Sequence, residues 1–146
     1  ELIDNVIGTN LTGPYLLSIE VAKRLIEKNM PGRMVNIASI AAYNTTPQSA
    51  ASLYSITKRA IVRMSEALAV EWSAKNINVN AIAPGAFSSE MMDGMIDRVG
   101  DISQAFPRKR IGLPEQMDST LLFLVSPSSE CVTGTCIKID DGQGSR

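Results

Sequence analysis

Histidine is absent from this sequence of 146 residues, and only two cysteines are present. Without histidine, the sequence excludes nucleophilic sites of the Ser-His-Asp and Cys-His types and most catalytic zinc sites. Cys131 and Cys136 have no second cysteine pair beside them, so no metal site is expected, and we expect two buried, reduced thiols. Any acid or base must therefore be a tyrosine, lysine, aspartate, glutamate or cysteine side chain.

Long apolar runs and an excess of one charge are also missing. No apolar stretch reaches the roughly 18 residues of a membrane span, and no charged and then apolar leader indicates a signal peptide. The 14 basic and 15 acidic residues are interspersed and give a net charge of −1, so nothing indicates a nucleic acid or a membrane as partner. The sequence therefore predicts a cytoplasmic protein with a small-molecule partner.

The composition is that of one globular domain. Hydrophobic residues make up 45% of the chain and charged residues 20%, which is enough apolar material for a core. The chain begins at Glu1, directly in a helical pattern and without a capping residue before it. We therefore expect residues 1–146 to be a fragment that forms part of a single domain.

Apolar spacing predicts alternating helices and strands. Helices are expected over residues 1–29, with an interruption at Gly13 and Pro14, over 52–75 and over 114–126. A buried strand is expected over 33–39, and further strands are expected over 76–85 and 136–140. Residues 40–50 have a loop composition, and residues 86–111, called the flap below, mix methionine, glycine and charges with room for one short helix. This order predicts an α/β fold with a parallel sheet and helices on both faces, as in dinucleotide-binding domains.

Tyr54 and Lys58 lie one helical turn apart near the start of the helix over 52–75. A phenol has a pKa of about 10, and lowering it to ~7 requires roughly 4 kcal/mol. A cation about 4 Å away supplies that energy at an effective dielectric near 20, but only ~1 kcal/mol in water. The pair can act as an acid and base only where it is shielded, and its place after a strand's carboxyl end favours shielding. Judged from these two residues alone, the pair could also be two polar side chains on an exposed face of the helix.

Other polar positions carry weaker indications. Pro14 has no N–H to bond the Asn10 carbonyl four residues back, so that carbonyl is free to bind a water or a side chain, unless the kink serves packing alone. Ser39 follows a strand and faces the Tyr54 helix, although a serine there also commonly caps backbone. Pro84 and Gly85 predict a turn that brings backbone close to a ligand.

Three methionines of the flap have two interpretations. Met91, Met92 and Met95 could line an apolar substrate pocket or pack as a surface helix, and the second interpretation is favoured.

Six segments in order resemble the C-terminal part of a short-chain dehydrogenase/reductase, with simple 3-oxoacyl reductases closest in pattern. They are NLTGPY with Asn10, VNIASIAA with Ser39, YSITK with Tyr54 and Lys58, NVNAIAPG with Pro84 and Gly85, RIGLPEQM at 110–117, and VTGTCIKIDDG at 132–142. The resemblance implies a Rossmann-like, doubly wound parallel sheet, of which residues 1–146 supply the catalytic C-terminal portion with about three strands. It also implies hydride transfer between NAD or NADP and a carbonyl or alcohol substrate, in a dimer or tetramer.

The resemblance also implies a role for each matched residue. Tyr54 would be the general acid and base at the substrate oxygen, and Ser39 would hydrogen-bond that oxygen. Lys58 would lower the tyrosine pKa and bind the nicotinamide ribose, while Asn10 would hold a water that links Lys58 to solvent. The nicotinamide would be lined by Tyr54, Lys58, Pro84, Gly85 and Ser89, with Ser89 where relatives usually have threonine.

The sequence departs from the family in two places. The family's Gly-rich phosphate loop is absent, together with the first βα units, on the order of 100 residues. The strand over 33–39 would then present an open edge, and the chain alone is expected to be marginally stable and inactive. In IDDGQG, Asp141 replaces a glycine.

Three alternative functions remain beside that of an oxidoreductase. The first is a non-catalytic fragment that acts as an assembly or binding unit through the helices over 1–29 and 52–75, which pack across subunits in relatives. Sugar-nucleotide epimerases share Y-x3-K but differ from the surroundings seen here. Enoyl reductases are disfavoured because their tyrosine and lysine lie further apart.

Overall fold

The computed structural model describes residues 1–45 and 51–144. Its helices and strands follow the predicted order, with several short 3-10 turns (η) and one π-helical turn, η1, between them. The elements are α1 (Leu2–Ile7), η1 (Gly8–Thr12), α2 (Gly13–Glu27), β1 (Gly32–Ile37), η2 (Ile40–Ala42), α3 (Ser52–Trp72), η3 (Ser73–Lys75), β2 (Ile77–Pro84), α4 (Glu90–Val99), η4 (Ser103–Ala105), η5 (Pro114–Met117), α5 (Asp118–Val125), η6 (Pro127–Ser129) and β3 (Cys136–Ile139).

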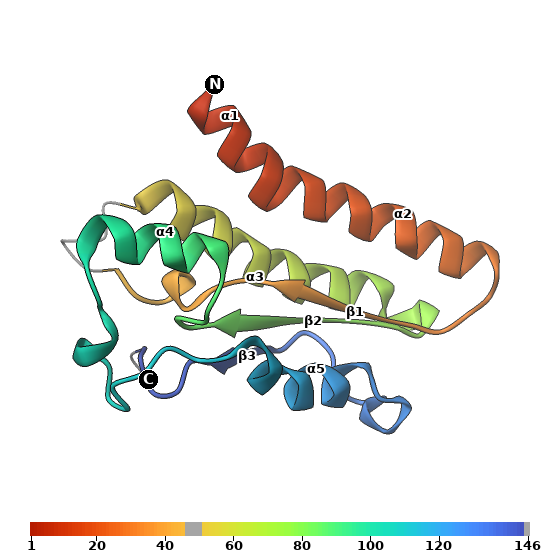
Figure 1. The fold of residues 1–146 in the computed structure, drawn as a ribbon. Helices are drawn as coiled ribbons and strands as arrows, with labels where there is room; N and C mark the ends of the chain where they lie inside the picture. The colour runs from red at the N-terminus through yellow and green to blue at the C-terminus, as the bar shows by residue number, and fades with distance from the viewer. Residues whose placement is uncertain (46–50, 145–146) are drawn as a thin grey trace.

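The sheet has three parallel strands in the order β1-β2-β3. Gly32 pairs with Ile77 at the start of β1, and Pro84 pairs with Ile139 at the end of β2. The helices α2 and α3 cover one face of the sheet, with α1 extending beyond it, and α5 covers the other face (Figure 1). This arrangement confirms the predicted Rossmann-like α/β fold with three strands and flanking helices.

The core lies between α3 and the central strand β2. Ile77, Val79 and Ala83 of β2 are fully buried, and the buried face of α3 packs against them with Ile61, Val62, Leu68, Ala69 and Trp72. Each fully buried aliphatic side chain stabilises the fold by roughly 1.5–3 kcal/mol. Apolar side chains on β2 therefore hold α3 in place, and α3 carries Tyr54 and Lys58. The predicted apolar side of this helix is Leu53, Ile56, Ala60, Ile61, Met64, Leu68 and Trp72; its one exposed member is Ile56.

The prediction of a buried strand over 33–39 is wrong. Within β1 only Gly32 is buried, and Ile37 at its end is 52% exposed. The reason is the position of β1 at the edge of the sheet, where none of the described residues forms a strand on its outer side. The predicted open edge is thus present, and its unpaired backbone groups are free to pair with another strand.

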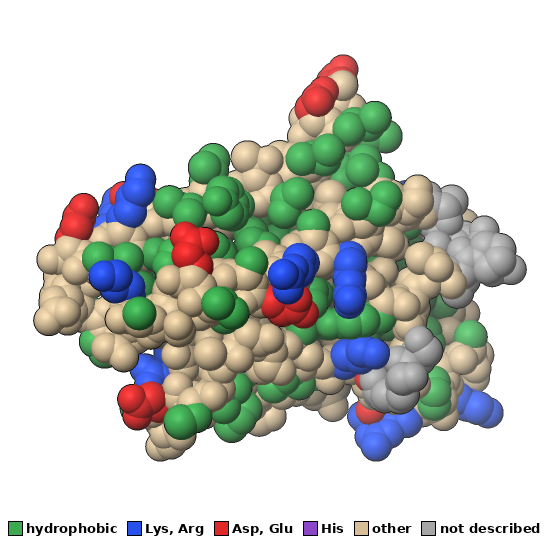
Figure 2. Space-filling view, turned by 180° about the vertical axis from the view of Figure 1, so that it is seen from behind, with side chains coloured by type: hydrophobic (Ala, Val, Ile, Leu, Met, Phe, Trp, Pro, Cys, Tyr) green, Lys and Arg blue, Asp and Glu red, His purple; other side chains and the backbone are tan. Residues whose placement is uncertain are grey.

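The first helix is continuous where an interruption was predicted at Gly13 and Pro14. A π-helical turn, η1, joins α1 to α2, and the Gly13 N–H donates to the Gly8 carbonyl five residues back. Proline has no N–H to give the usual bond to Asn10, and a π-turn accommodates this change without breaking the helix. The N-terminal end projects from the body and carries exposed hydrophobic side chains, among them Leu2 and Ile3 (Figure 2).

Two expectations about smaller features need correction. Cys131 is exposed and Cys136 is only half-buried, so the prediction of two buried thiols is wrong; both are free. Cys131 lies in the irregular segment before β3, whereas Cys136 lies on an edge strand. The flap contains the ten-residue helix α4, which is one short helix as expected. None of the helices in residues 1–45 and 51–144 has the length and apolar character needed to cross a membrane.

Candidate active site

The candidate site lies where the three parallel strands end. Ser39 follows β1, Pro84 and Gly85 end β2, and Asp140 follows β3. The ends are joined by backbone bonds, since Ala38 N–H donates to the Ile82 carbonyl at 2.8 Å and Gly85 N–H to the Ile139 carbonyl at 2.8 Å. Ligands of open α/β sheets bind outside the carboxyl ends of the strands, so this edge is the place to look for chemistry.

Ser39 lies between β1 and the short turn η2. Its hydroxyl oxygen accepts a hydrogen bond from the Ala41 N–H at 3.1 Å and so caps η2, which is the capping role weighed for it from the sequence. The hydroxyl can still donate its own proton, and none of the described residues accepts it. A capped serine with a free O–H is held in one orientation and can donate to a substrate oxygen.

Tyr54 and Lys58 lie in the first turns of α3, which contacts η2. Both are half-buried, and the Lys58 ammonium nitrogen is 5.6 Å from the centre of the Tyr54 ring. Lys58 Nζ also donates to the Ile37 carbonyl, at 3.0 Å. Burial lowers the pKa of Lys58 below its usual value. The pair is therefore partly shielded, and the lysine is attached to the last residue of β1.

Asn10 lies in the π-turn η1, where it is brought against α3. Its side-chain amide donates to the Thr57 hydroxyl at 3.2 Å, and that hydroxyl donates to the Tyr54 carbonyl at 2.8 Å. Thr57 is 2% exposed, so the chain of bonds is shielded from water. The amide of Asn10 thus fixes η1 against the turn of α3 that carries both Tyr54 and Lys58.

Thr57 is a site residue that the sequence analysis missed. The available signal was a threonine three positions after Tyr54, because a helical threonine hydroxyl can bond a carbonyl three or four residues back. Its second partner, Asn10, is 47 residues away in sequence and could not be read from local spacing.

A groove of about 600 Å³ brings Asn10 and Lys58 together with Pro14, Ile37 and Met34. It runs between the first helix and β1. Ser39 and Tyr54 do not line it; Ser39 directly precedes η2 and Tyr54 lies in α3, two elements that contact each other. Hydrogen bonds therefore link Asn10 to the turn of Tyr54 through Thr57, and Lys58 to the end of β1, while Ser39 follows that strand two residues later.

The other residues predicted to line the nicotinamide differ in their burial and their contacts. Pro84 and Gly85 are half-buried at the end of β2, next to the residues that follow β3. Ser89 is exposed and caps α4, because its hydroxyl accepts the Met92 N–H at 3.2 Å. Ser89 therefore has a structural role, and a contact with a cofactor stays a prediction.

A second tyrosine, Tyr43, also follows Ser39 but differs in its surroundings. Burial and a hydrogen bond with Cys136 raise the pKa of Tyr43 to about 12. The Lys138 ammonium lies 4.4 Å from the centre of its ring and the Arg59 guanidinium 5.0 Å from it. At neutral pH Tyr43 keeps its proton, so it is a packing residue below two cations and no candidate for acid and base chemistry.

The residues present fit one end of a dinucleotide. An ammonium has three donors, and Lys58 uses one on Ile37, which leaves two for ribose hydroxyls in the groove. The start of α4 is a poor place for an anion, because its first turn carries the acidic residues Glu90 and Asp93. Lys58 can therefore donate to a ribose, and a contact of Pro84 or Gly85 with a nicotinamide stays a prediction.

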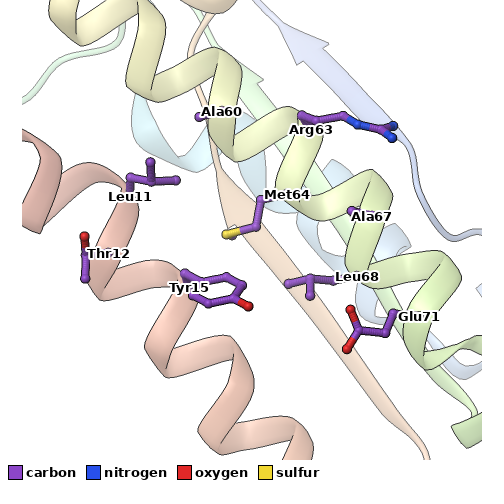
Figure 3. Close-up of a pocket in the computed structure, with 9 residues that line it drawn as sticks. All are labelled: Leu11, Thr12, Tyr15, Ala60, Arg63, Met64, Ala67, Leu68 and Glu71. Carbon is purple, nitrogen blue, oxygen red and sulfur yellow. The ribbon is translucent and has the colours of Figure 1, made fainter.

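A second hollow, of about 520 Å³, lies between the first helix and α3. Leu11 and Tyr15 point across it toward Met64 and Leu68, while Arg63 points away from it (Figure 3). None of the predicted catalytic residues lines it, and its walls are mostly apolar. It is a surface suited to packing rather than to chemistry.

Comparison with known proteins places these observations in a family. A family model described as enoyl-(acyl carrier protein) reductase matches residues 1–143. The chain is 33% identical over 143 residues to a 3-oxoacyl-[acyl-carrier-protein] reductase of Rickettsia bellii, covering 97% of this chain and 58% of that protein.

Solved structures agree with that match. A 4-hydroxyisoleucine dehydrogenase complexed with NADH has a TM-score of 0.80 at 33% identity, with 97% of this chain and 59% of that one covered. For ElxO with NADP bound the TM-score is 0.83 at 30% identity, with 97% and 57% covered. The chain thus spans somewhat more than half the length of the relatives that it matches.

Proposed function

The chain belongs to the short-chain dehydrogenase/reductase family, and from that premise we propose that it supplies the catalytic portion of an oxidoreductase. The proposed reaction moves a hydride between a nicotinamide cofactor and a carbonyl or alcohol substrate. One observation carries the proposal: hydrogen bonds run from Asn10 through Thr57 to the backbone carbonyl of Tyr54, and Lys58, one turn further along α3, is bonded to the strand that leads to Ser39.

Each residue has a distinct task in the proposed reduction. The cofactor, when bound, supplies the hydride that adds to the carbonyl carbon. The Tyr54 hydroxyl donates its proton to the carbonyl oxygen, which becomes the alcohol oxygen. The Ser39 hydroxyl donates a hydrogen bond to the same oxygen and stabilises the negative charge that develops on it. Lys58 holds the ribose and places a positive charge beside the tyrosine, and Asn10 supports the path by which a proton returns.

The cofactor is proposed to be NAD or NADP, since relatives hold one or the other. A carbonyl or alcohol substrate is favoured over an enoyl one, although the family model's description names enoyl reductases. The reason is the spacing of Tyr54 and Lys58, which lie four residues apart in adjacent turns of α3, closer than in enoyl reductases. The intact enzyme is proposed to be a dimer or tetramer.

The test uses an extended protein, which we define as this chain expressed with any coding sequence that precedes Glu1 in its gene. Oxidation of NADH and NADPH is followed at 340 nm with a panel of ketones and 3-oxoacyl thioesters. Turnover on the order of 10 per second in the extended protein, with none in the 146-residue chain, is the expected result. An extended protein that binds neither dinucleotide would refute the proposal.

A second candidate function is that of a non-catalytic assembly unit. The observation that favours it is the exposed apolar surface of the first helix, where Leu2, Ile3, Leu16 and Leu17 are all exposed, beside the hollow of Figure 3. A self-associating chain that binds no dinucleotide, with Leu16→Asp and Leu17→Asp returning it to a monomer, would support this function instead. Sedimentation of the chain and of both variants decides between the two.

A further inference from the structure

The flap leaves β2 at Ala86, and its far end, at Arg110 and Ile111, comes back beside its beginning. Its two stems lie side by side, since Phe87 and Gly112 form a parallel bridge. Gly112 N–H donates to the Ala86 carbonyl at 2.9 Å, and Ser88 N–H donates to the Gly112 carbonyl at 2.9 Å. These bonds close the flap on itself, but they do not attach it to the sheet.

The attachment comes from the C-terminal turn, which we define as residues 140–144. The Gln143 side-chain oxygen accepts the Ala86 N–H at 2.6 Å, on the outgoing stem. Asp141 binds the returning stem through two arginines: its carboxylate lies 2.6 Å from Arg110 Nε and 3.0 Å from an Arg108 nitrogen. Arg110 lies 31 positions before Asp141, and Ala86 lies 57 positions before Gln143. Both stems of the flap therefore contact the same turn.

The C-terminal turn is itself rigid. Asp140 is 2% exposed, and its two carboxylate oxygens accept the N–H groups of Gly142 at 3.2 Å and Gly144 at 3.0 Å. Asp141 and Gly142 both have positive φ, +53° and +84°, which turns the chain back toward the flap. A turn fixed in this way offers the flap a defined place of attachment.

The turn also touches the predicted nicotinamide loop. A Cβ placed on Gly85 would lie 2.9 Å from the Asp140 Cα, closer than real contacts allow, so Gly85 permits the turn to approach. The Asp141 side chain is 17% exposed, and the Arg110 guanidinium lowers its pKa. Together these contacts place the end of β2, both stems of the flap and the C-terminal turn in one connected unit.

We propose that Asp141 and Gln143 are positioning residues that hold the two stems of the flap against the carboxyl edge of the sheet. The inference rests on the proposed function: the attachment fixes the flap relative to Ser39 and Tyr54, and so it determines how a carbonyl substrate is held. Neither residue touches the reacting atoms. They act through Ala86, Arg108 and Arg110.

The first test is hydrogen exchange of the 146-residue chain, which needs no activity. Asp141→Asn keeps a residue that tolerates positive φ but removes the charge, and Gln143→Ala removes the acceptor. Both should raise exchange at residues 86–88 and 110–112 by about threefold, as expected for a solvent-accessible charged contact, and leave β2 amides unchanged. Asp97→Asn is the matched control, with the same charge change on an exposed residue of α4. Stem exchange equal to that of the control would overturn the proposal.

A double-variant cycle tests the arginine contact. If Asp141 acts through Arg110, adding Arg110→Gln to Asp141→Asn should change stem exchange less than Arg110→Gln does alone. Fully additive effects would overturn the assignment of Arg110 as partner. Because global unfolding would speed exchange everywhere, unchanged β2 amides show that each variant is folded.

The second test is kinetic and uses the extended protein. Asp141→Asn should raise the KM of the carbonyl substrate severalfold and leave kcat within about twofold, because the flap holds substrate and Tyr54 transfers the proton. A fall in kcat with KM unchanged would overturn the positioning role. If the wild-type extended protein has no activity, the proposed function fails, and the exchange comparison still decides whether the C-terminal turn holds the flap.

Discussion

Two sides of the candidate site are held in place by different kinds of contact. On the helix side, Asn10 and Thr57 are joined by a shielded hydrogen bond, and Thr57 is almost fully buried. On the flap side, Asp141 binds Arg108 and Arg110, whose side chains are largely exposed to solvent. Buried polar groups are expensive to leave without partners, whereas exposed ion pairs contribute little. Breaking the contacts of the helix side therefore costs more free energy than breaking the ion pairs of the flap side.

The largest effect on the helix side should come from Tyr54→Phe, which removes only a hydroxyl. In the extended protein, turnover should fall by about 10²–10⁴-fold, because general acid and base groups contribute that much. Cofactor affinity should be nearly unchanged, since Lys58 still holds the ribose. The measurements are kcat at 340 nm and dinucleotide binding by fluorescence titration. Retention of more than a tenth of wild-type activity would contradict the role of Tyr54.

The next effect should be on stability. Thr57→Val keeps the shape of the side chain but leaves the Asn10 amide without its acceptor, which should reduce the free energy of unfolding by about 1–3 kcal/mol. Thr57→Ser, the matched control, keeps the hydroxyl and should lose less. Urea unfolding of the 146-residue chain measures both. Equal losses in the two variants would mean that the methyl group, and not the bond to Asn10, matters here.

A smaller effect concerns the protonation of Lys58. Burial lowers its folded-state pKa, so the unfolded chain holds the proton more tightly and the charged lysine reduces folded stability at neutral pH. That cost is fully present below the folded pKa, and it is lost as the pH rises from the folded pKa to the usual lysine pKa. The stability advantage of Lys58→Met over wild type should therefore shrink between pH 7 and pH 10. Urea unfolding at several pH values measures it, and a constant difference would show that burial does not disfavour the charge.

The smallest effect is expected on the flap side. Arg110 lowers the folded-state pKa of Asp141, so the contact stabilises the fold above the usual carboxyl pKa and is lost as the pH falls through the folded value. Wild type should thus melt above Asp141→Asn at pH 5 and 7, with the gap closing near pH 3. Thermal unfolding at these three pH values is the measurement. A gap that widens in acid would contradict the ion pair.

How far the sequence could predict this molecule depended on the range of the contacts. The strands β2 and β3 and the helix α3 were predicted to within a few residues, because local apolar patterns reflect burial on the central strand and on the helix that covers it. For β1 the same pattern gave the right element and the wrong burial. Its exposure depends on whether another strand lies beside it, which no local pattern records.

The candidate site divides in the same way. Tyr54, Lys58 and Ser39 could be proposed from short motifs; the first two lie on α3, and Ser39 precedes η2, which contacts α3. The ties made by Thr57 and Gln143 could not, since each joins residues about 50 positions apart. Asp141 was noticed only as a departure from a family pattern. Its contacts with two arginines give that departure a physical explanation.

The parallel pairing of β1 with β2 also bears on the order of events during folding. Gly32 of β1 pairs with Ile77 of β2, and α3 lies between the two strands in the sequence. The strands can therefore pair only when the segment that forms α3 has crossed over the sheet. Non-local pairings of this kind fold slowly compared with helical bundles, because loop closure must precede the contacts that reward it. We therefore expect α3 to form early and to act as the surface on which both strands assemble. In that order, the helix that carries Tyr54 and Lys58 is also the folding template for the sheet beneath it.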